Sequence, residues 1–347
     1  MRVELSTIPP YLYAMYSIED PRSEAARLLL SIVAEEMLHV ALAANLLVGI
    51  GGEPDFLDAA VQPRYPGLLA HHRPDLPLHL APASPALIRS TFMVIEQPEP
   101  TDARPEADDF HTLSQFYAAL EDAIERLSSE RPLFVTGTET RQVASQHFYG
   151  VVEFNVAGSG GLVFVDDLAT ASRAIEIIVH QGEGLADHRW ADPGHRELTH
   201  YAKLVRIADG TTPLGPVRPV RTDPRTADFP AELRPISDLF NAVYRALFHV
   251  LDALYRPGGV QSELVGTLYL LMADIMGPLA RHLTTMPLGD GTLAGPTFEW
   301  INLGSDPVAS LARLASEVAA TEPRLAETVA PLLTGDSLSA LRSEVHS

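Results

Sequence analysis

The chain has 347 residues, with 25 Lys and Arg against 45 Asp and Glu, so its formal net charge is −20 at pH 7. A protein this acidic is repelled by phosphate backbones and anionic lipid, which argues against nucleic acid and membranes as partners. The sequence has no cysteine, which excludes disulfides, zinc–thiolate sites, iron–sulfur clusters and cysteine nucleophiles. Any bound metal must therefore be held by carboxylates and imidazoles.

Apolar residues at helical spacing dominate the start of the chain. A first helix from about residue 4 to 16 contains Pro9 and Pro10, so we expect it to be kinked or made of two pieces. A longer helix is predicted over 23–48, ending at Gly49.

Loops and helices alternate in the next part. Residues 53–89 are rich in Pro and His and are expected to form a long ordered loop. Segment 151–165 has β-branched residues and glycines that suit either a short hairpin or a loop. Amphipathic spacing predicts further helices over 111–128, 168–182 and 197–207.

Several prolines between residues 209 and 235 indicate a connector. Beyond it, helices are predicted over 236–255, 262–285, 307–320 and 323–333. The expected organisation is an all-α chain: a four-helix bundle over 1–208 with long loops, the connector over 209–235, and additional C-terminal helices over 236–347 packed on the bundle.

The hydrophobic segments of the chain do not have the pattern of a signal peptide or a membrane span. The N-terminal residues contain no apolar run of the kind found in signal peptides. The most apolar stretch, 264–280, contains Asp274 and Pro278 and is shorter than the roughly 20 residues that a membrane span needs. We expect this stretch to be a buried helix and the protein to be cytoplasmic.

Glu36 and His39 form a pair on the helix predicted over 23–48. Residues three apart share one helix face, and the flanking residues are apolar, so this face is expected to point inward. An ionised carboxylate in an apolar interior needs a partner or a metal, and Glu-x-x-His is the pairing with which helical bundles hold iron or manganese. A single such pair can equally be a surface Glu beside a His that bonds a neighbour.

A second pair with the same spacing, Glu197 and His200, makes coincidence less attractive. A di-iron bundle also takes one Glu from each of two further helices. Glu4, which precedes an apolar helix face, and Glu183, at the end of the helix over 168–182, are the candidates. Glu183 could instead be a helix C-cap carboxylate that faces water.

Several motifs together resemble one known family. They are residues 4–18 (ELSTIPPYLYAMYSI), 35–39 (EEMLH), 92–98 (FMVIEQP), 174–184 (AIEIIVHQGEG), 197–201 (ELTHY), 240–244 (FNAVY) and 294–299 (AGPTFE). In this order they resemble the ferritin-like domain of the iminophenyl-pyruvate dimer synthase family, which includes enzymes of violacein and indolocarbazole biosynthesis.

This resemblance implies a ferritin-like fold with a carboxylate–histidine iron site. It supports six metal ligands: Glu4, Glu36, His39, Glu183, Glu197 and His200. The family often has Ile-Gly-Glu-x-Tyr where this chain has Leu113-Ser-Gln-Phe-Tyr117, so Gln115 stands where a further Glu ligand would be expected. Glu96, in the 92–98 motif, is expected to make a structural hydrogen bond.

The expected function is that of a non-haem, di-iron oxidase or oxygenase. Its substrate would be small and amino-acid-derived, its co-substrate O₂, and its context specialised metabolism; two iron ions are expected, with manganese as the alternative metal, and a homo-oligomer is allowed. The rival interpretation is a non-catalytic metal-binding or scaffold protein that keeps the bundle. A pocket wide enough for a substrate beside the metals would favour the enzyme, whereas a site plugged by Tyr and Leu would favour the scaffold.

Overall fold

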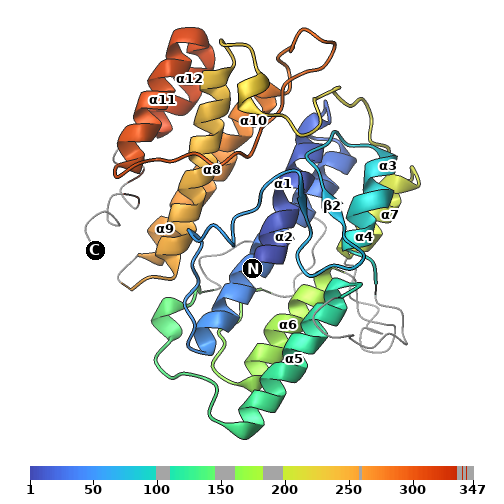
Figure 1. Ribbon diagram of the computed structural model, residues 1–347, viewed down its shortest axis with the longest axis vertical. Helices are drawn as coiled ribbons and strands as arrows, with labels where there is room; N and C mark the ends of the chain where they lie inside the picture. Colours follow the sequence, from blue (N-terminus) through green and yellow to red (C-terminus); the bar gives the residue numbers. More distant parts are fainter. Residues whose placement is uncertain are drawn as a thin grey trace. The chain divides into compact units, whose positions relative to one another are not determined.

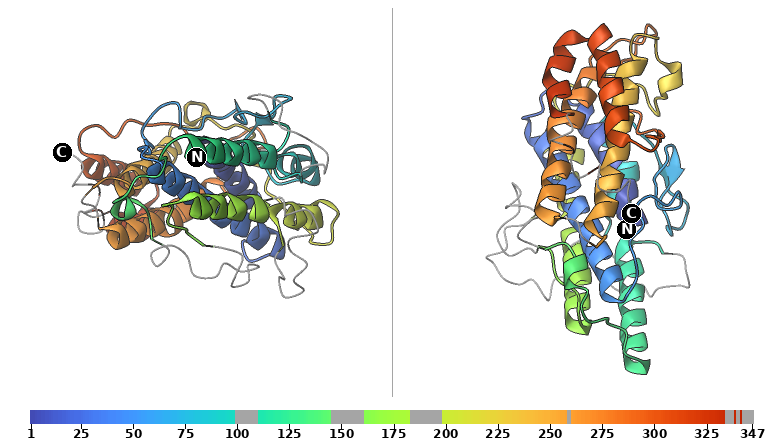
Figure 2. Two further views of the ribbon diagram at one scale, coloured as in Figure 1. Left: turned by 90° about the horizontal axis from the view of Figure 1, so that it is seen from below. Right: turned by 90° about the vertical axis from the view of Figure 1, so that its left-hand side faces the viewer.

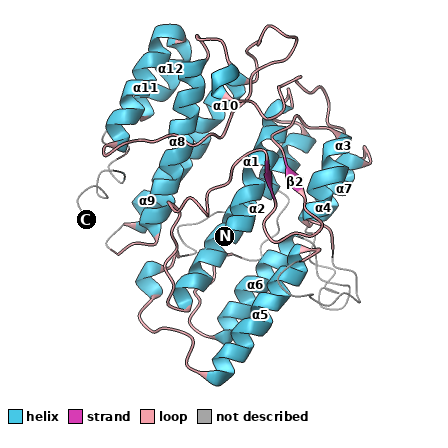
Figure 3. Ribbon diagram, in the orientation of Figure 1, coloured by secondary structure: helices cyan, strands magenta, loops and turns pink. Residues whose placement is uncertain are grey.

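The computed structural model describes residues 1–98, 110–144, 161–182, 198–257 and 260–333, together with 338 and 341. Helices dominate these residues (Figure 3). Two short strands, β1 (Gly67–Leu68) and β2 (Pro77–Leu78), form an antiparallel pair within the loop predicted over 53–89. The all-α class predicted from periodicity is therefore confirmed.

The chain divides into two compact units. The first consists of Met1–Pro54, Gly67–Leu78 and Ala83–Pro216, and the second of Asp55–Pro66, His79–Pro82 and the chain from Val217 onward. The division near residue 216 falls inside the predicted connector. The finer boundaries at 208 and 235 stay predictions.

Two long helices open the first unit (Figure 1). Helix α1 (Arg2–Ser17) is one uninterrupted helix that contains Pro9 and Pro10, so the prediction of two pieces is wrong. Nearly all of its residues are buried, and α1 packs against α2 (Glu24–Gly49). Tertiary packing therefore outweighs the backbone hydrogen bonds that the two prolines remove.

Both ends of α2 follow the sequence prediction. The Ser23 side chain caps the first turn by accepting a hydrogen bond from the Ala26 N–H at 3.3 Å. At the last residue, Gly49, a Cβ would lie 2.5 Å from the backbone oxygen of Val165. Only glycine permits this close approach, which joins the end of α2 to the segment before α6.

A third helical segment of the first unit was not predicted. Helix α3 (Pro85–Leu87), a π-helical turn over Ile88–Phe92 and α4 (Met93–Ile95) follow one another directly. The Ser84 side chain starts this segment by accepting a hydrogen bond from the Leu87 N–H, so the helix begins inside the expected loop. The segment ends just before Glu96.

The remaining helices of the first unit lie close to their predicted positions. They are α5 (Leu113–Glu130), α6 (Leu168–Gly182) and α7 (His200–Ala208). Helices α5 and α6 lie side by side (Figures 1 and 2), and α2 packs against both α6 and α7. The π-helical turn packs against α7, and this contact completes the bundle around the buried face of α2.

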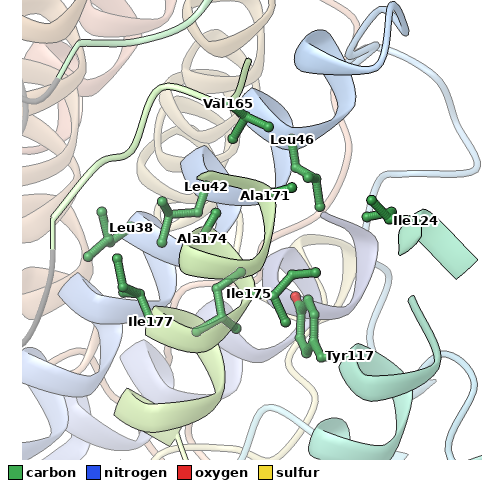
Figure 4. Close-up of a cluster of buried hydrophobic side chains, with 11 residues drawn as sticks. Leu38, Leu42, Leu46, Tyr117, Ile124, Val165, Ala171, Ala174, Ile175 and Ile177 are labelled. Atoms are coloured by element: carbon green, nitrogen blue, oxygen red, sulfur yellow. The ribbon is translucent and has the colours of Figure 1, made fainter. Parts of the chain in front are cut away.

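The core of this bundle is apolar. Figure 4 shows Leu38, Leu42 and Leu46 of α2 interleaved with side chains of α6 such as Ala174 and Ile175. Helix α5 contributes two residues to the same cluster, Tyr117 and Ile124. The apolar i, i+4 face of α2 thus lies against α5 and α6, as periodicity predicts.

The second unit is also helical. Its helices are α8 (Arg234–Leu254), α9 (Gln261–Tyr269), α10 (Gly277–Leu283), α11 (Pro307–Thr321) and α12 (Pro323–Val329), with a π-helical stretch over Leu270–Met276 between α9 and α10. Short 3-10 turns cover Glu139–Arg141 in the first unit and Thr226–Asp228 and Ala330–Leu332 in the second. Asn241 of α8 donates to the Thr297 hydroxyl and accepts from the Glu299 N–H, which fixes the 297–299 segment on α8.

Two helices in the described residues are long and apolar enough to cross a membrane, judged by length and composition alone. They are Glu24–Gly49 and the helical stretch Gln261–Leu283. The second includes 264–280 and lies close to the helix predicted over 262–285. Within the protein, 78% of the apolar window of the first helix and 56% of that of the second are buried. Buried core helices pass the same test, so the finding is weak evidence for a membrane span.

Candidate metal centre

Four of the six predicted ligands converge inside the first unit. Carboxylate and imidazole atoms form two groups, each with its atoms within 4.8 Å of one another. The first group is Glu4, Glu36 and His39, and the second is Glu36, Glu96 and His200. Glu36 belongs to both, so it is placed to bridge two metal positions.

The helices explain how these side chains meet. Glu36 and His39 share the buried face of α2 through their i, i+3 spacing. Glu4 lies in the first turn of α1, which packs against α2. His200 is the first residue of α7, whose start is fixed by Thr199 accepting a hydrogen bond from the Ala202 N–H.

Glu96 is the residue whose role the sequence prediction missed. It follows α4 directly and is 1% exposed. The π-helical turn before α4 packs against α7, which brings Glu96 Oε2 to 3.4 Å from His200 Nδ1. The signal in the sequence was a carboxylate placed directly after the apolar run 92–95. The hydrogen bond expected for Glu96 is also present, from Tyr11.

Each histidine turns the same ring nitrogen toward the carboxylates. His39 Nδ1 lies 3.6 Å from Glu4 Oε2 and 3.7 Å from Glu36 Oε1. His200 Nδ1 lies 3.1 Å from Glu36 Oε1. The two imidazole rings are stacked with centroids 5.5 Å apart, so the two nitrogen donors face one shared polar space.

The other ring nitrogen of each histidine has an acceptor behind it. His39 Nε2 lies 3.0 Å from Gln181 Oε1, and His200 Nε2 lies 2.8 Å from Glu35 Oε2. Lys203 Nζ lies 2.5 Å from the same Glu35 oxygen. For His39, the acceptor at Nε2 favours the tautomer that leaves Nδ1 free for a metal, which is the usual arrangement of metal-binding histidines.

One hydroxyl group orients each of the three carboxylates. Thr7 donates to Glu36 Oε2 at 2.8 Å, Tyr11 donates to Glu96 Oε1 at 2.5 Å, and Tyr117 donates to Glu4 Oε1. The second oxygen of each carboxylate then faces a histidine. These hydroxyls leave one directed oxygen per carboxylate for a ligand.

The same contacts shift the pKa values of the metal-free site. Burial raises the pKa of Glu36 to about 7, with the nearby charges of Glu96 and Glu4 adding to the effect. Burial also acts to raise the pKa of Glu4, but the hydrogen bond and charge of His39 lower it to about 2. Burial acts to lower the pKa of His200, yet the facing carboxylates, Glu96 foremost, raise it well above its usual value.

A narrow pocket with a cavity volume of about 10 Å³, part of it open to solvent, reaches the site. Glu4, Glu36, His39 and Glu96 form its polar end. Its other walls are mostly apolar and come from α5 and α6: Leu113, Ser114, Tyr117, Ile178, Val179 and Gly182. The space beside the candidate metal positions is therefore about that of one water molecule, with Leu113 and Tyr117 among the residues that narrow it.

Two of the predicted ligands lie outside the described residues. These are Glu183 and Glu197, and their role as ligands stays a prediction. Gln115 is described, and its side chain is engaged at the start of α5. The side-chain oxygen of Gln115 accepts a hydrogen bond from the His111 N–H at 2.9 Å. The backbone N–H of Gln115 donates to the Thr112 hydroxyl oxygen. This resembles a capping box at the start of α5.

The residues present fit a metal pair. Glu4 Oε2 and both ring nitrogens of His200 are buried and make no hydrogen bond to any residue that the structure describes, although polar groups in protein interiors are normally paired. Carboxylate and imidazole donors without thiolates suit iron or manganese. The arrangement can therefore hold two divalent cations with Glu36 between them.

Comparisons with known proteins agree with this fold. The Ferritin-like family model matches residues 1–209. Dichlorochromopyrrolate synthase from Lentzea aerocolonigenes is 27% identical over 86% of this chain, and the chain spans 35% of that protein's length. The crystal structure of a ferritin-like protein from Caulobacter vibrioides has a TM-score of 0.61 at 25% identity, covering 84% of this chain and 94% of that one. The predicted resemblance is confirmed, and the chain belongs to the Ferritin-like family.

Proposed function

We propose that this chain is a non-haem di-iron oxidase or oxygenase that acts with O₂ on a small, amino-acid-derived substrate in specialised metabolism. The observation that carries the proposal is the pair of buried ligand groups that share Glu36. Buried carboxylates that converge on imidazoles are costly unless cations compensate them. In helical bundles, this donor set typically holds two iron or manganese ions.

A bound iron pair would supply the redox equivalents for reaction with O₂. The chain itself contributes geometry. Thr7, Tyr11 and Tyr117 hold the carboxylates in fixed orientations, and Gln181 and Glu35 do the same for the two imidazoles. Positioned donors of this kind lower the reorganisation that accompanies a change in charge.

The lining of the narrow pocket, rather than its volume of about 10 Å³, supports a small substrate. Leu113, Ile178 and Val179 provide apolar contact area, and such walls exclude water from the polar end. The substrate would place its apolar part against α5 and α6 and its reacting part next to Glu4 and His39.

The substrate class rests on the comparison with a biosynthetic enzyme. The relative from Lentzea aerocolonigenes is named as a dichlorochromopyrrolate synthase. Because the chain spans 35% of that protein's length, we carry over the class of specialised-metabolism enzyme and leave out the synthase reaction itself.

Anaerobic loading with Fe(II), followed by elemental analysis and O₂-consumption measurements, tests the proposal. We expect about two iron ions per chain and O₂ uptake that amino-acid-derived compounds stimulate. Protein that takes up only zinc, or no metal, would contradict the metal centre.

A non-catalytic metal-binding protein is the second candidate. The narrowing of the pocket by Leu113 and Tyr117 favours it. This candidate predicts that iron binds at the same stoichiometry but that O₂ uptake stops after one oxidation of the bound iron. The same experiment therefore separates the two candidates.

A further inference from the structure

The two histidines of the centre have partners of different charge behind them. His39 Nε2 faces the neutral amide oxygen of Gln181 at 3.0 Å. His200 Nε2 faces the carboxylate of Glu35 at 2.8 Å, and Glu35 is bound in turn by Lys203 at 2.5 Å. Both members of the Glu35–Lys203 pair are buried, Lys203 completely so (0% exposed).

We propose that Glu35 and Lys203 are positioning residues that make the two metal positions unequal. The position formed by Glu36, Glu96 and His200 becomes the tight one. The position formed by Glu4, Glu36 and His39, where the described residues place the neutral Gln181 behind the imidazole, becomes the weaker and exchangeable one. This inference rests on the proposed metal centre.

A carboxylate behind a metal-binding imidazole acts on the metal through the ring. The negative charge of Glu35, 2.8 Å from His200 Nε2, raises the basicity of that ring as a ligand more than the neutral amide behind His39 does. His200 has this support and His39 has the weaker amide. The difference in charge between Glu35 and Gln181 therefore favours a cation at the His200 position.

Lys203 makes the buried Glu35 carboxylate tolerable. An unpaired carboxylate at this depth would be strongly destabilising, whereas a paired one is not. Lys203 lies one helical turn after His200 on α7, so a single short helix supplies both the histidine and the cation that neutralises its partner. The Glu35 carboxylate places negative charge behind the His200 ring, and the positive charge of Lys203 keeps the net charge of the Glu35–Lys203 pair at zero.

Access to the two positions differs in the same direction. Glu4, Glu36, His39 and Glu96 line the pocket. His200 is fully buried and is absent from the described residues that line it. All three donors of the His39 position therefore line the pocket, against two of the three donors of the His200 position.

Stepwise titration of the full, metal-free chain with Mn(II), followed by electron paramagnetic resonance, tests the inference without any need for turnover. The wild-type protein should bind two ions with clearly separate affinities. The double variant Glu35→Gln/Lys203→Met, which removes both buried charges together, should weaken the tighter step by roughly 10–100-fold and leave the weaker step nearly unchanged.

The matched variant is Gln181→Glu, which places a carboxylate behind His39 instead. It should tighten the weaker step and bring the two affinities together. This variant keeps Glu35 and Lys203 intact, so it tests the inference even if the double variant fails to fold.

Two equal affinities in the wild-type protein, or a folded double variant with unchanged binding, would overturn this inference and leave the metal centre standing. A Gln181→Glu variant whose weaker step is unchanged would also overturn it. Wild-type protein that binds no metal would overturn the metal centre and the inference together.

Discussion

Replacing Glu36 with Gln should abolish binding at both metal positions and yet stabilise the metal-free protein. Glu36 is shared by the two ligand groups, so its loss removes a donor from each. In the metal-free state, however, its carboxylate is buried near Glu4 and Glu96, which raise its pKa together with burial. A neutral amide of the same size avoids this repulsion and can still accept the Thr7 hydrogen bond.

The size of the effect follows from the pKa. A rise from 4.5 to about 7 corresponds to about 3 kcal/mol against the ionised form of Glu36 in the folded protein. The penalty is absent below the unfolded pKa of 4.5, grows as the pH rises, and is complete above about 7. Glu36→Gln should therefore raise the free energy of unfolding by about 3 kcal/mol at pH 8 and by less than about 1 kcal/mol at pH 5.

Urea unfolding of chelator-treated protein at the two pH values measures this difference. Glu4→Gln is the matched control, because His39 lowers the pKa of Glu4 to about 2 against the effect of burial. Removal of the Glu4 charge should lower the free energy of unfolding by about 3 kcal/mol at pH 5. The wild-type protein loses the stabilisation that this charge provides only as the pH falls from 4.5 toward 2. If Glu36→Gln destabilised the metal-free protein at pH 8, the reasoning about this buried cluster would be refuted.

Three further predictions concern metal content. His39→Ala should lower the bound metal from about two ions to about one with unchanged helicity by circular dichroism; a variant that unfolds would identify His39 as a core residue instead. Gln115→Glu should leave the metal stoichiometry unchanged by elemental analysis, because the side chain caps α5 through His111; an increase would show that it reaches the metals. Calorimetry should find that metal binding weakens as the pH falls below about 7 and releases protons, because burial first, and then nearby carboxylates, raise the pKa of Glu36 to that value; affinity that is independent of pH would contradict this.

Local patterns were enough to predict much of the fold. The apolar spacing of α2 and its Gly49 end predicted that helix nearly to the residue. The same rules placed α6 at 168–182. They failed at Pro9 and Pro10, because the packing of α1 against α2 decides that helix and leaves no local mark in the sequence.

The residues of the candidate site also differ in whether local sequence patterns predict them. Glu36 and His39 were predictable because an i, i+3 pair inside an apolar helix is a local pattern. Glu96 was predicted only as a structural residue, since a single carboxylate after an apolar run has many uses. The pairing of Glu35 with Lys203, 168 positions apart, depends on how α2 and α7 pack. The Thr112–Gln115 cap was visible as a Thr-x-x-Gln pattern, and it explains the Gln that the family comparison had presented as a missing ligand.

Anomalous diffraction at the iron edge, from crystals of anaerobically iron-loaded protein, tests the central claim most directly. The account predicts two peaks per chain, one next to Glu4 and His39 and one next to Glu96 and His200, with Glu36 in contact with both. A single peak remote from these residues, or no peak, would contradict it.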